Sequence, residues 1–431
     1  MTPTGAAMTW FWQAWLAAIV FLFPIPHTIA LRSLLLLIGT LALLWSCRQT
    51  LPRLAPWLRP AAWWWVALTA WIVFHSAIVA PEPTVAFDQF RANWLMPLLF
   101  GAIGAWAAKQ LHQERASQAV IAALAAHMVW LLGWQFKLWL TTGYWPFKAT
   151  PFGAYDYHGT INGFFLTLLV ADRLAFALGR YSPLALGKLV GWGLLVLSLL
   201  SDLALQSRNS TAITLFMLLA ASLGLLNSRS HHWRTIMVAI GVIALIGLGS
   251  MQFDNRWQGL RESLVVGWTS PSMHWINLTS TDPATWPLTP SGKKVEESAY
   301  LRAAWARQAI DFIATHPLGI GFGHDAFGRA IALKHGHPGF GSSHSSWLDF
   351  TLGTGLAGLG LLLVTGVVVV RSAWIRFRDW EDGEALLLCF LVGGYMLRCL
   401  LDGHLSGWRL GLFAFICGVL IAAMKNPRRQ A

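Results

Sequence analysis

Charged residues are scarce in this sequence. Asp, Glu, Lys and Arg make up 12% of the 431 residues, whereas 56% are apolar and the mean hydropathy is +0.53. Because ordinary soluble domains contain about 25% charged residues, this composition excludes a typical water-soluble fold and predicts a membrane protein. Charge-free runs such as 61–79 and 235–251 approach the roughly 20 residues that cross the hydrocarbon core of a bilayer.

Cysteine and nucleotide-binding signals are also nearly absent. The four cysteines lie inside or at the edge of apolar runs, with no CxxC pair and no zinc spacing, so they predict neither a disulfide framework nor a metal centre. The glycines of GIGFG follow no strand and precede no GKS or GKT, which argues against a phosphate loop. The first apolar run lacks a basic start and a cleavage pattern, and we interpret it as a retained helix.

Tryptophan, by contrast, is abundant. Many of the 26 Trp residues lie near the ends of apolar runs, where aromatic side chains anchor membrane-spanning helices at the interface. The net charge of +12 comes from basic residues that are scattered between apolar segments, and this pattern does not predict a nucleic-acid partner.

The apolar runs predict an all-α polytopic membrane protein with about twelve spans. The predicted cores are 10–24, 29–45, 61–79, 94–108, 119–140, 161–177, 189–205, 211–226, 235–251, 347–370, 385–401 and 410–424. Every second connection is basic, so the positive-inside rule places those connections and both termini in the cytoplasm. The chain then divides into nine spans over 1–252, a large outer loop over 253–346, and three spans with a cytoplasmic tail over 347–431.

The loop over 253–346 is where we expect the chemistry. Residues 296–314 have apolar side chains at helical spacing and acidic residues at the start, which predicts an amphipathic helix. The following HPLGIGFGHDAFG is interrupted by four glycines and a proline, and we interpret it as loop or re-entrant backbone.

Two arginines outside the cytoplasmic connections are candidate site residues. Arg208, in QSRNST between two spans, lies where the charge bias of the topology would not place it. Arg302 and Arg307 lie in the amphipathic helix five residues apart, so only one need face a site. Arginine suits a diphosphate because its planar fork matches phosphate oxygens. Arg302 has two interpretations, a site residue or a solvated charge beside Glu296 and Glu297.

Histidines gather in the second half of the loop. His344, in SSHSSWLD, directly precedes a span, and its near-neutral pKa would suit a general base for a sugar hydroxyl. A metal site built from His335, His337 and His344 with Asp325 or Asp349 is a weaker alternative, because the spacing matches no known zinc motif. Asp172 has a simple internal partner in the adjacent Arg173.

Together these motifs carry a family resemblance. They are the spans, an SRN-type arginine between two of them, and a large loop that carries LR, HPLGIGFG and SSHSSWLDF before LGTGLAGLGLLL. This combination resembles the O-antigen ligase and polymerase superfamily, and the ligase branch most closely. The resemblance implies a helical, GT-C-like fold in a bacterial inner membrane and a metal-independent, inverting glycosyltransferase without cofactors. It also implies undecaprenyl diphosphate-linked O-antigen as donor and lipid A-core as acceptor, with the active site in the periplasm and roles in lipopolysaccharide biosynthesis.

The same resemblance implies roles for single residues. Arg208 and Arg302 match the family's two arginines and would hold the carrier diphosphate, with Arg91 as a possible addition. His344 matches the loop histidine and would activate the acceptor hydroxyl. The family often has Asn where this chain has Ser345, and His337 therefore remains an alternative base.

Three other functions stay open. An O-antigen polymerase shares the donor chemistry but tends to have two sizeable outer loops, and a protein O-oligosaccharyltransferase often carries a further C-terminal segment. A solute transporter would show internal symmetry and interrupted helices with polar groups at the midplane, and the sequence shows neither clearly.

Overall fold

The computed structural model contains helices and connecting turns, and the residues that it describes form no named strand. It describes residues 3–49, 56–111, 113–226, 237, 241, 259–270, 275–276, 286–336 and 341–424. A single isolated bridge joins Leu288 and Lys294. The prediction of an all-α protein is therefore confirmed for this part of the chain.

Each predicted span within the described residues falls on a helix. The bundle helices are α1 (Pro3–Leu22), α2 (Ile29–Gln49), α3 (Arg59–Phe74), α5 (Met96–Lys109), α6 (Gln113–Thr142), α7 (Tyr155–Ala177), α8 (Lys188–Leu205), α9 (Arg208–Leu226), α14 (Ser346–Trp380), α15 (Gly383–Leu401) and α16 (Gly407–Ala423). In the part of the chain that the structure describes, eight helical segments are long and apolar enough to cross a membrane, while Met8–Leu22 and Gly407–Ala423 are shorter. The predicted span 235–251 lies almost wholly outside the described residues, so the total of twelve stays a prediction.

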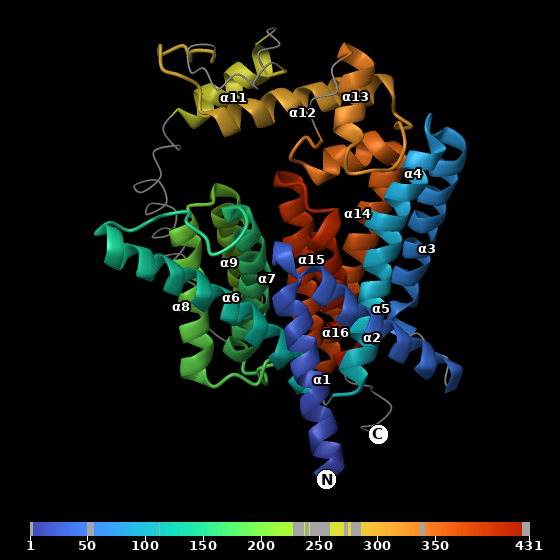
Figure 1. The fold of residues 1–431 in the computed structure, drawn as a ribbon, viewed down its shortest axis with the longest axis vertical. Helices are drawn as coiled ribbons and strands as arrows, with labels where there is room; N and C mark the ends of the chain where they lie inside the picture. The colour runs from blue at the N-terminus through green and yellow to red at the C-terminus, as the bar shows by residue number, and fades with distance from the viewer. Residues whose placement is uncertain are drawn as a thin grey trace.

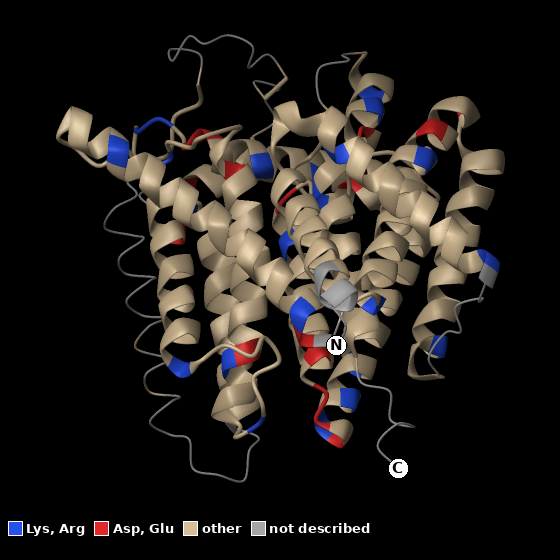
Figure 2. Cartoon of the chain, turned by 60° about the horizontal axis from the view of Figure 1, so that its bottom comes forward, with Lys and Arg blue, Asp and Glu red and all other residues tan. Residues whose placement is uncertain are grey.

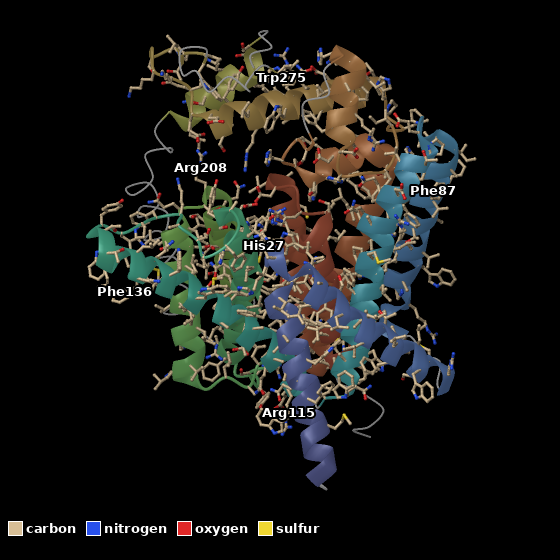
Figure 3. The ribbon with its side chains drawn as sticks, in the orientation of Figure 1. His27, Phe87, Arg115, Phe136, Arg208 and Trp275 are labelled. Atoms are coloured by element: carbon tan, nitrogen blue, oxygen red, sulfur yellow. The ribbon has the colours of Figure 1, made fainter. Side chains whose placement is uncertain are left out.

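The bundle has two distinct ends. Helices α11 (Leu260–Thr269), α12 (Glu297–Thr315) and α13 (Ala326–His335) lie across one end, which we call the loop end, and both termini lie at the opposite end (Figure 1). Charged residues gather toward the two ends, and the middle of the bundle carries few of them (Figure 2). Arg115 lies near the N-terminal end of the molecule, whereas Arg208 lies beneath the loop-end helices (Figure 3). Arg115 and Arg208 therefore lie toward opposite ends of the bundle, which agrees with the prediction that their connections face opposite sides of the membrane.

Helices α5 and α16 approach each other closely because small residues line their contact. A Cβ added at Gly418 would overlap the Gly101 carbonyl oxygen, and one added at Gly104 would overlap that of Phe415. Close backbone approach through small residues is a common way for helices to associate where lipid provides no hydrophobic drive.

Helix α14 is kinked, and the glycine-rich loop segment binds at the kink. Gly355 has φ 74° and ψ 178°, which interrupts the helical hydrogen bonds and leaves nearby carbonyls without helical partners. The amides of Ile320 and Gly321 donate to the carbonyls of Leu352 and Gly353, at 2.8 and 3.0 Å. The predicted re-entrant stretch thus satisfies backbone groups that a bilayer could not satisfy.

A buried ion pair lies near the C-terminal end of α7. Asp172 accepts from the Arg173 Nε at 2.9 Å and from the Ser182 hydroxyl at 2.6 Å. Both charged side chains are almost fully buried. The adjacent residue is therefore the partner of Asp172, as the sequence predicts.

Candidate active site

Four parts of the chain meet under the loop end. They are the start of α9, helix α12, the turn 341–345 before α14, and the connection 402–406 between α15 and α16. The amphipathic helix predicted over 296–314 is observed as α12, one residue from the predicted bounds. Its N-cap carboxylate, Glu296, accepts from the Ala299 amide at 2.7 Å, which explains where the helix begins.

Arg302 points from α12 toward the bundle. Its Nη1 donates to the Asn209 Oδ1 at 2.8 Å and to the Leu401 carbonyl at 3.1 Å, and its Nη2 lies 3.3 Å from the Asp402 Oδ1. Asn209 in turn donates to the same Asp402 oxygen at 2.7 Å. The side chain of Arg302 remains 33% exposed, so it is held in place and still accessible to a ligand.

Arg208 lies next to this cluster. It is the first residue of α9, directly before Asn209, and its Nη2 lies 2.8 Å from the Glu296 Oε1 at the start of α12. The two arginines are 94 residues apart in sequence and both connect α9 to α12. Each faces a carboxylate that fixes its position in the protein.

His344 occupies a constrained turn. Its φ is +59°, a left-handed conformation that is unusual for a residue other than glycine. Asp349 holds the turn, because its carboxylate accepts from the Ser342 hydroxyl at 2.7 Å and from the Ser343 amide at 2.9 Å. The imidazole stacks on Trp305 of α12, with ring centroids 5.3 Å apart and planes inclined by 13°.

The local environment favours a neutral His344. His344 keeps an exposed face, but the protein around it partly desolvates the ring and lowers its pKa below the usual value, and Arg302 lowers it further. The charges of Asp402 and Asp156 raise the pKa of His344, and the charge of Arg409 lowers it. A neutral imidazole at physiological pH is able to accept a proton.

The connection 402–406 is fixed against the start of α14. The Ser346 hydroxyl donates to the Asp402 carbonyl at 3.0 Å and accepts from the Leu405 amide at 2.9 Å. The Arg398 Nε donates to the His404 Nε2 at 2.9 Å, and this ring is buried. Burial and Arg398 lower the pKa of His404, so the ring stays a neutral acceptor.

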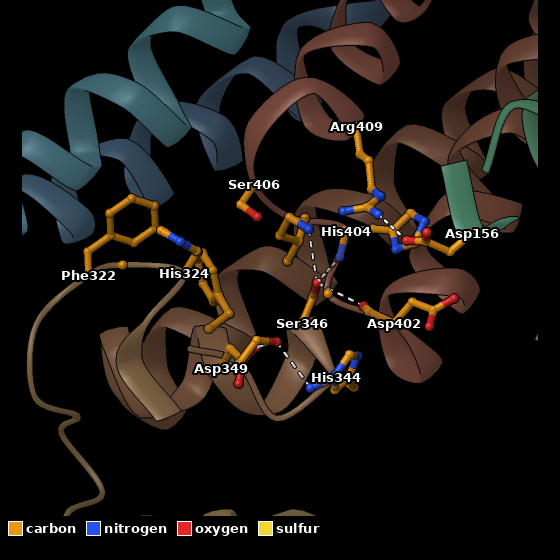
Figure 4. A pocket seen from close by; sticks show the side chains of 15 residues that line it. Asp156, Phe322, His324, His344, Ser346, Asp349, Asp402, His404, Ser406 and Arg409 are labelled. Atoms are coloured by element: carbon orange, nitrogen blue, oxygen red, sulfur yellow. Dashed lines mark hydrogen bonds and ion pairs between the residues drawn. The ribbon is translucent and has the colours of Figure 1, made fainter. Parts of the chain in front are cut away.

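Two openings meet at His344. A polar cavity of about 240 Å³ is lined by Asp156, His344, Asp349, Asp402, His404 and Arg409 among others (Figure 4). A larger groove of about 750 Å³ has mainly apolar walls from α11, α12, α14 and α15 and includes Arg302. His344 is the single described residue that lines both spaces.

The comparison with known families agrees with this geometry. Residues 193–363 match the protein-family model described as O-antigen ligase. This match covers 171 of the 431 residues and supports membership of the O-antigen ligase and polymerase superfamily. The matched region includes Arg208, Arg302 and His344. No curated protein sequence matches the chain.

Other predicted site residues lie elsewhere. Arg91 is exposed, pairs with Asp88 at 3.3 Å, and lines neither the polar cavity nor the groove. His337 lies outside the described residues. Arg307 lines neither space and donates to the Trp268 carbonyl at 2.7 Å, which joins α12 to α11. Of the two arginines in this helix, Arg302 is therefore the one at the candidate site.

The alternative metal site gains no support from the described residues. Among them, no group of three His, Cys, Asp or Glu side chains has a metal-binding arrangement. His335 instead lies 3.4 Å from Gln308 and has ring contact with Trp275.

Sequence reasoning missed several residues of this candidate site. Asp402, His404 and Arg409 line the polar cavity, and Arg398 supports His404. A signal was available, since Arg398 and Arg409 flank a short connection on the side where the charge bias predicts few arginines. The same argument had singled out Arg208.

Proposed function

We propose that the protein is an O-antigen ligase that transfers O-antigen from undecaprenyl diphosphate to lipid A-core. The observation that supports this function is the meeting of Arg302 and His344 at one groove, with Arg208 beside Arg302. A permanent cation and a neutral base are the two groups that such a transfer requires on opposite sides of the reacting carbon.

The arginines would stabilise the leaving group. As the glycosidic bond breaks, negative charge develops on the diphosphate, and guanidinium groups bind phosphate oxygens through paired, charge-assisted hydrogen bonds. Glu296 and Asp402 hold the arginines in place before the substrate arrives, so little reorganisation is needed. Many phosphate-handling enzymes use a metal ion to supply positive charge. In this arrangement the arginines would supply that charge.

His344 would act as the general base. It accepts the proton of the acceptor hydroxyl while that oxygen attacks the anomeric carbon, and the configuration there is inverted. The carboxylate of Asp349 and the stacked Trp305 fix the position of the ring.

The groove would hold the polyprenyl chain. Its walls include Leu264, Trp268, Ile310 and Leu359, and the first three of these apolar side chains, on α11 and α12, are exposed. An apolar channel that ends at Arg302 suits a ligand with a lipid tail and a charged head.

A reconstituted transfer assay tests the proposal. The purified protein is given undecaprenyl diphosphate-linked O-antigen and lipid A-core, with EDTA and without nucleotide, and glycosylated lipid is measured. We expect product from the parent chain, a loss of about 10²-fold or more in His344→Gln, and a comparable loss in Arg302→Gln. Arg307→Gln on the same helix and His335→Gln on α13 are matched controls that should retain activity.

The products separate the alternatives. Growth of carrier-linked chains without transfer to lipid would make the protein a polymerase. Absence of any glycan transfer by the well-folded parent would contradict a glycosyltransferase function. Full activity of His344→Gln would contradict the role of this histidine and return His337 to consideration.

A further inference from the structure

We propose that the polar cavity is the binding site for the acceptor sugar, and that the Asp156–Arg409 pair recognises its hydroxyl groups. This inference rests on the proposed function and assigns the second substrate to a place in the molecule. Asp156 is at the start of α7, and Arg409 is in the first turn of α16. Neither residue lies in the region that matches the family model.

The first argument is the position of His344 between the two spaces. The groove contains Arg302 and apolar side chains, whereas the cavity contains Asp156, Asp402 and Arg409. In an inverting displacement the nucleophile attacks from the side opposite the leaving group. If the diphosphate leaves on the groove side, the acceptor hydroxyl has to arrive from the cavity side, where it meets the same histidine.

The second argument is charge. Asp156, Asp349 and Asp402 contribute three carboxylates to the cavity wall, and Arg409 contributes one guanidinium. Asp156 pairs with Arg409, and Asp402 pairs with Arg302 and Arg398, which do not line the cavity. The one guanidinium on the wall is already paired with a carboxylate, so the cavity offers a diphosphate no excess positive charge, and the nearby carboxylates disfavour it. An uncharged sugar ring is not repelled, and its hydroxyl groups can donate to carboxylates and accept from arginine.

The third argument is size. The cavity volume of about 240 Å³ lies below the roughly 300–1,000 Å³ that is typical of pockets for drug-sized ligands. The space therefore suits one sugar ring rather than an oligosaccharide. Phe322 and Phe350 form an apolar part of the wall, with ring centroids 5.9 Å apart.

The fourth argument is the geometry of the Asp156–Arg409 pair. The Arg409 Nη2 binds the Asp156 Oδ2, and the guanidinium lies over the rings of Tyr157 and Trp408, each 5.3 Å from the ring centroid. These contacts fix the orientation of the pair. The side chain of Asp156 remains 43% exposed and can still accept hydrogen bonds from a ligand.

Steady-state kinetics with both substrates tests the proposal. Lipid A-core is titrated at saturating undecaprenyl diphosphate-linked O-antigen, and then the donor is titrated at saturating lipid A-core. We expect Asp156→Asn and Arg409→Gln to raise the KM for lipid A-core by about tenfold or more, since each loses a charged hydrogen bond, and to leave the KM for the donor within about twofold. The matched controls are Asp379→Asn and Arg378→Gln, which alter an exposed pair at the other end of α14.

Ser406→Phe provides an independent variant if loss of the ion pair prevents folding. Ser406 lines the cavity and makes no capping hydrogen bond at the start of α16, so a phenyl group there should obstruct the acceptor without removing a charge. The same selective rise in the KM for lipid A-core is expected.

The failures of the two proposals are distinguishable. Transfer by the parent chain with a changed donor KM in these variants, or with no change in either KM, would overturn the acceptor site and leave the proposed function standing. Absence of transfer by the parent chain would overturn the proposed function itself.

Discussion

His344 shows how a single side chain acquires its properties from several segments. The turn that contains it depends on Asp349 of α14, its ring rests on Trp305 of α12, and its pKa responds to Arg302 and Asp402. A left-handed backbone conformation at a non-glycine residue is costly and persists only where surrounding contacts hold it. The strain is therefore consistent with a residue whose position matters for function.

The pH dependence of transfer should report the charges around His344. A general base is active when neutral, so the acid limb of kcat/KM should have its midpoint below the ordinary histidine value of about 6.5. Arg302→Gln removes a group that lowers this pKa, and the midpoint should move to higher pH. Asp402→Asn removes a group that raises it, and the midpoint should move to lower pH.

The two variants control for each other, because both disturb the same ion pair while the expected shifts have opposite signs. The measurement is the initial rate of transfer between about pH 4.5 and 8 at low donor concentration. Midpoints that coincide in the parent and both variants would show that another group titrates.

Among the elements, the contact of α5 with α16 depends most clearly on glycine. The added Cβ of Gly418→Ala would overlap the carbonyl of Gly101, and the two backbones would have to separate. We expect a loss of about 1–3 kcal/mol in the free energy of unfolding, as for overpacked cores. The measurement is unfolding in detergent followed by circular dichroism.

Gly193→Ala is the matched control on α8. No atom lies within 4 Å of the added Cβ, and the position is exposed on the bundle surface. Because alanine favours helix over glycine by about 1 kcal/mol, this variant should be neutral or slightly more stable. Equal destabilisation by both substitutions would mean that helix packing is not the cause.

At the scale of the whole molecule, the arrangement of the two ends makes a topological prediction. The loop-end helices and the chain termini lie at opposite ends of the bundle (Figure 1). If the basic connections face the cytoplasm, Ser291 and the candidate active site face the periplasm. Ser291, in the predicted outer loop, and Lys188, the first residue of α8, are both exposed, and the predicted topology assigns them to opposite sides of the membrane.

Cysteine labelling in bacterial spheroplasts measures this orientation. In a chain with Cys47→Ser, Ser291→Cys should react with a membrane-impermeant maleimide in intact spheroplasts, whereas Lys188→Cys should react only after permeabilisation. The background variant without either new cysteine gives the reference signal. The reverse pattern would place the active site in the cytoplasm and exclude a donor presented in the periplasm.

The class of fold, the bundle helices, the amphipathic helix, the family resemblance and three candidates, Arg208, Arg302 and His344, could be predicted from the sequence alone, whereas α4 (Pro83–Phe90), α11 and α13 could not. These features follow from local patterns: the length of apolar runs, helical spacing from 296 to 314, and motifs of neighbouring residues. Only the tertiary structure decided that Arg302 rather than Arg307 faces the site, that Asp349 holds the turn of His344, and that Asp156 meets Arg409. The physical reason is that such contacts join segments as much as 253 residues apart, and the packing of helices, rather than spacing along the chain, brings them together.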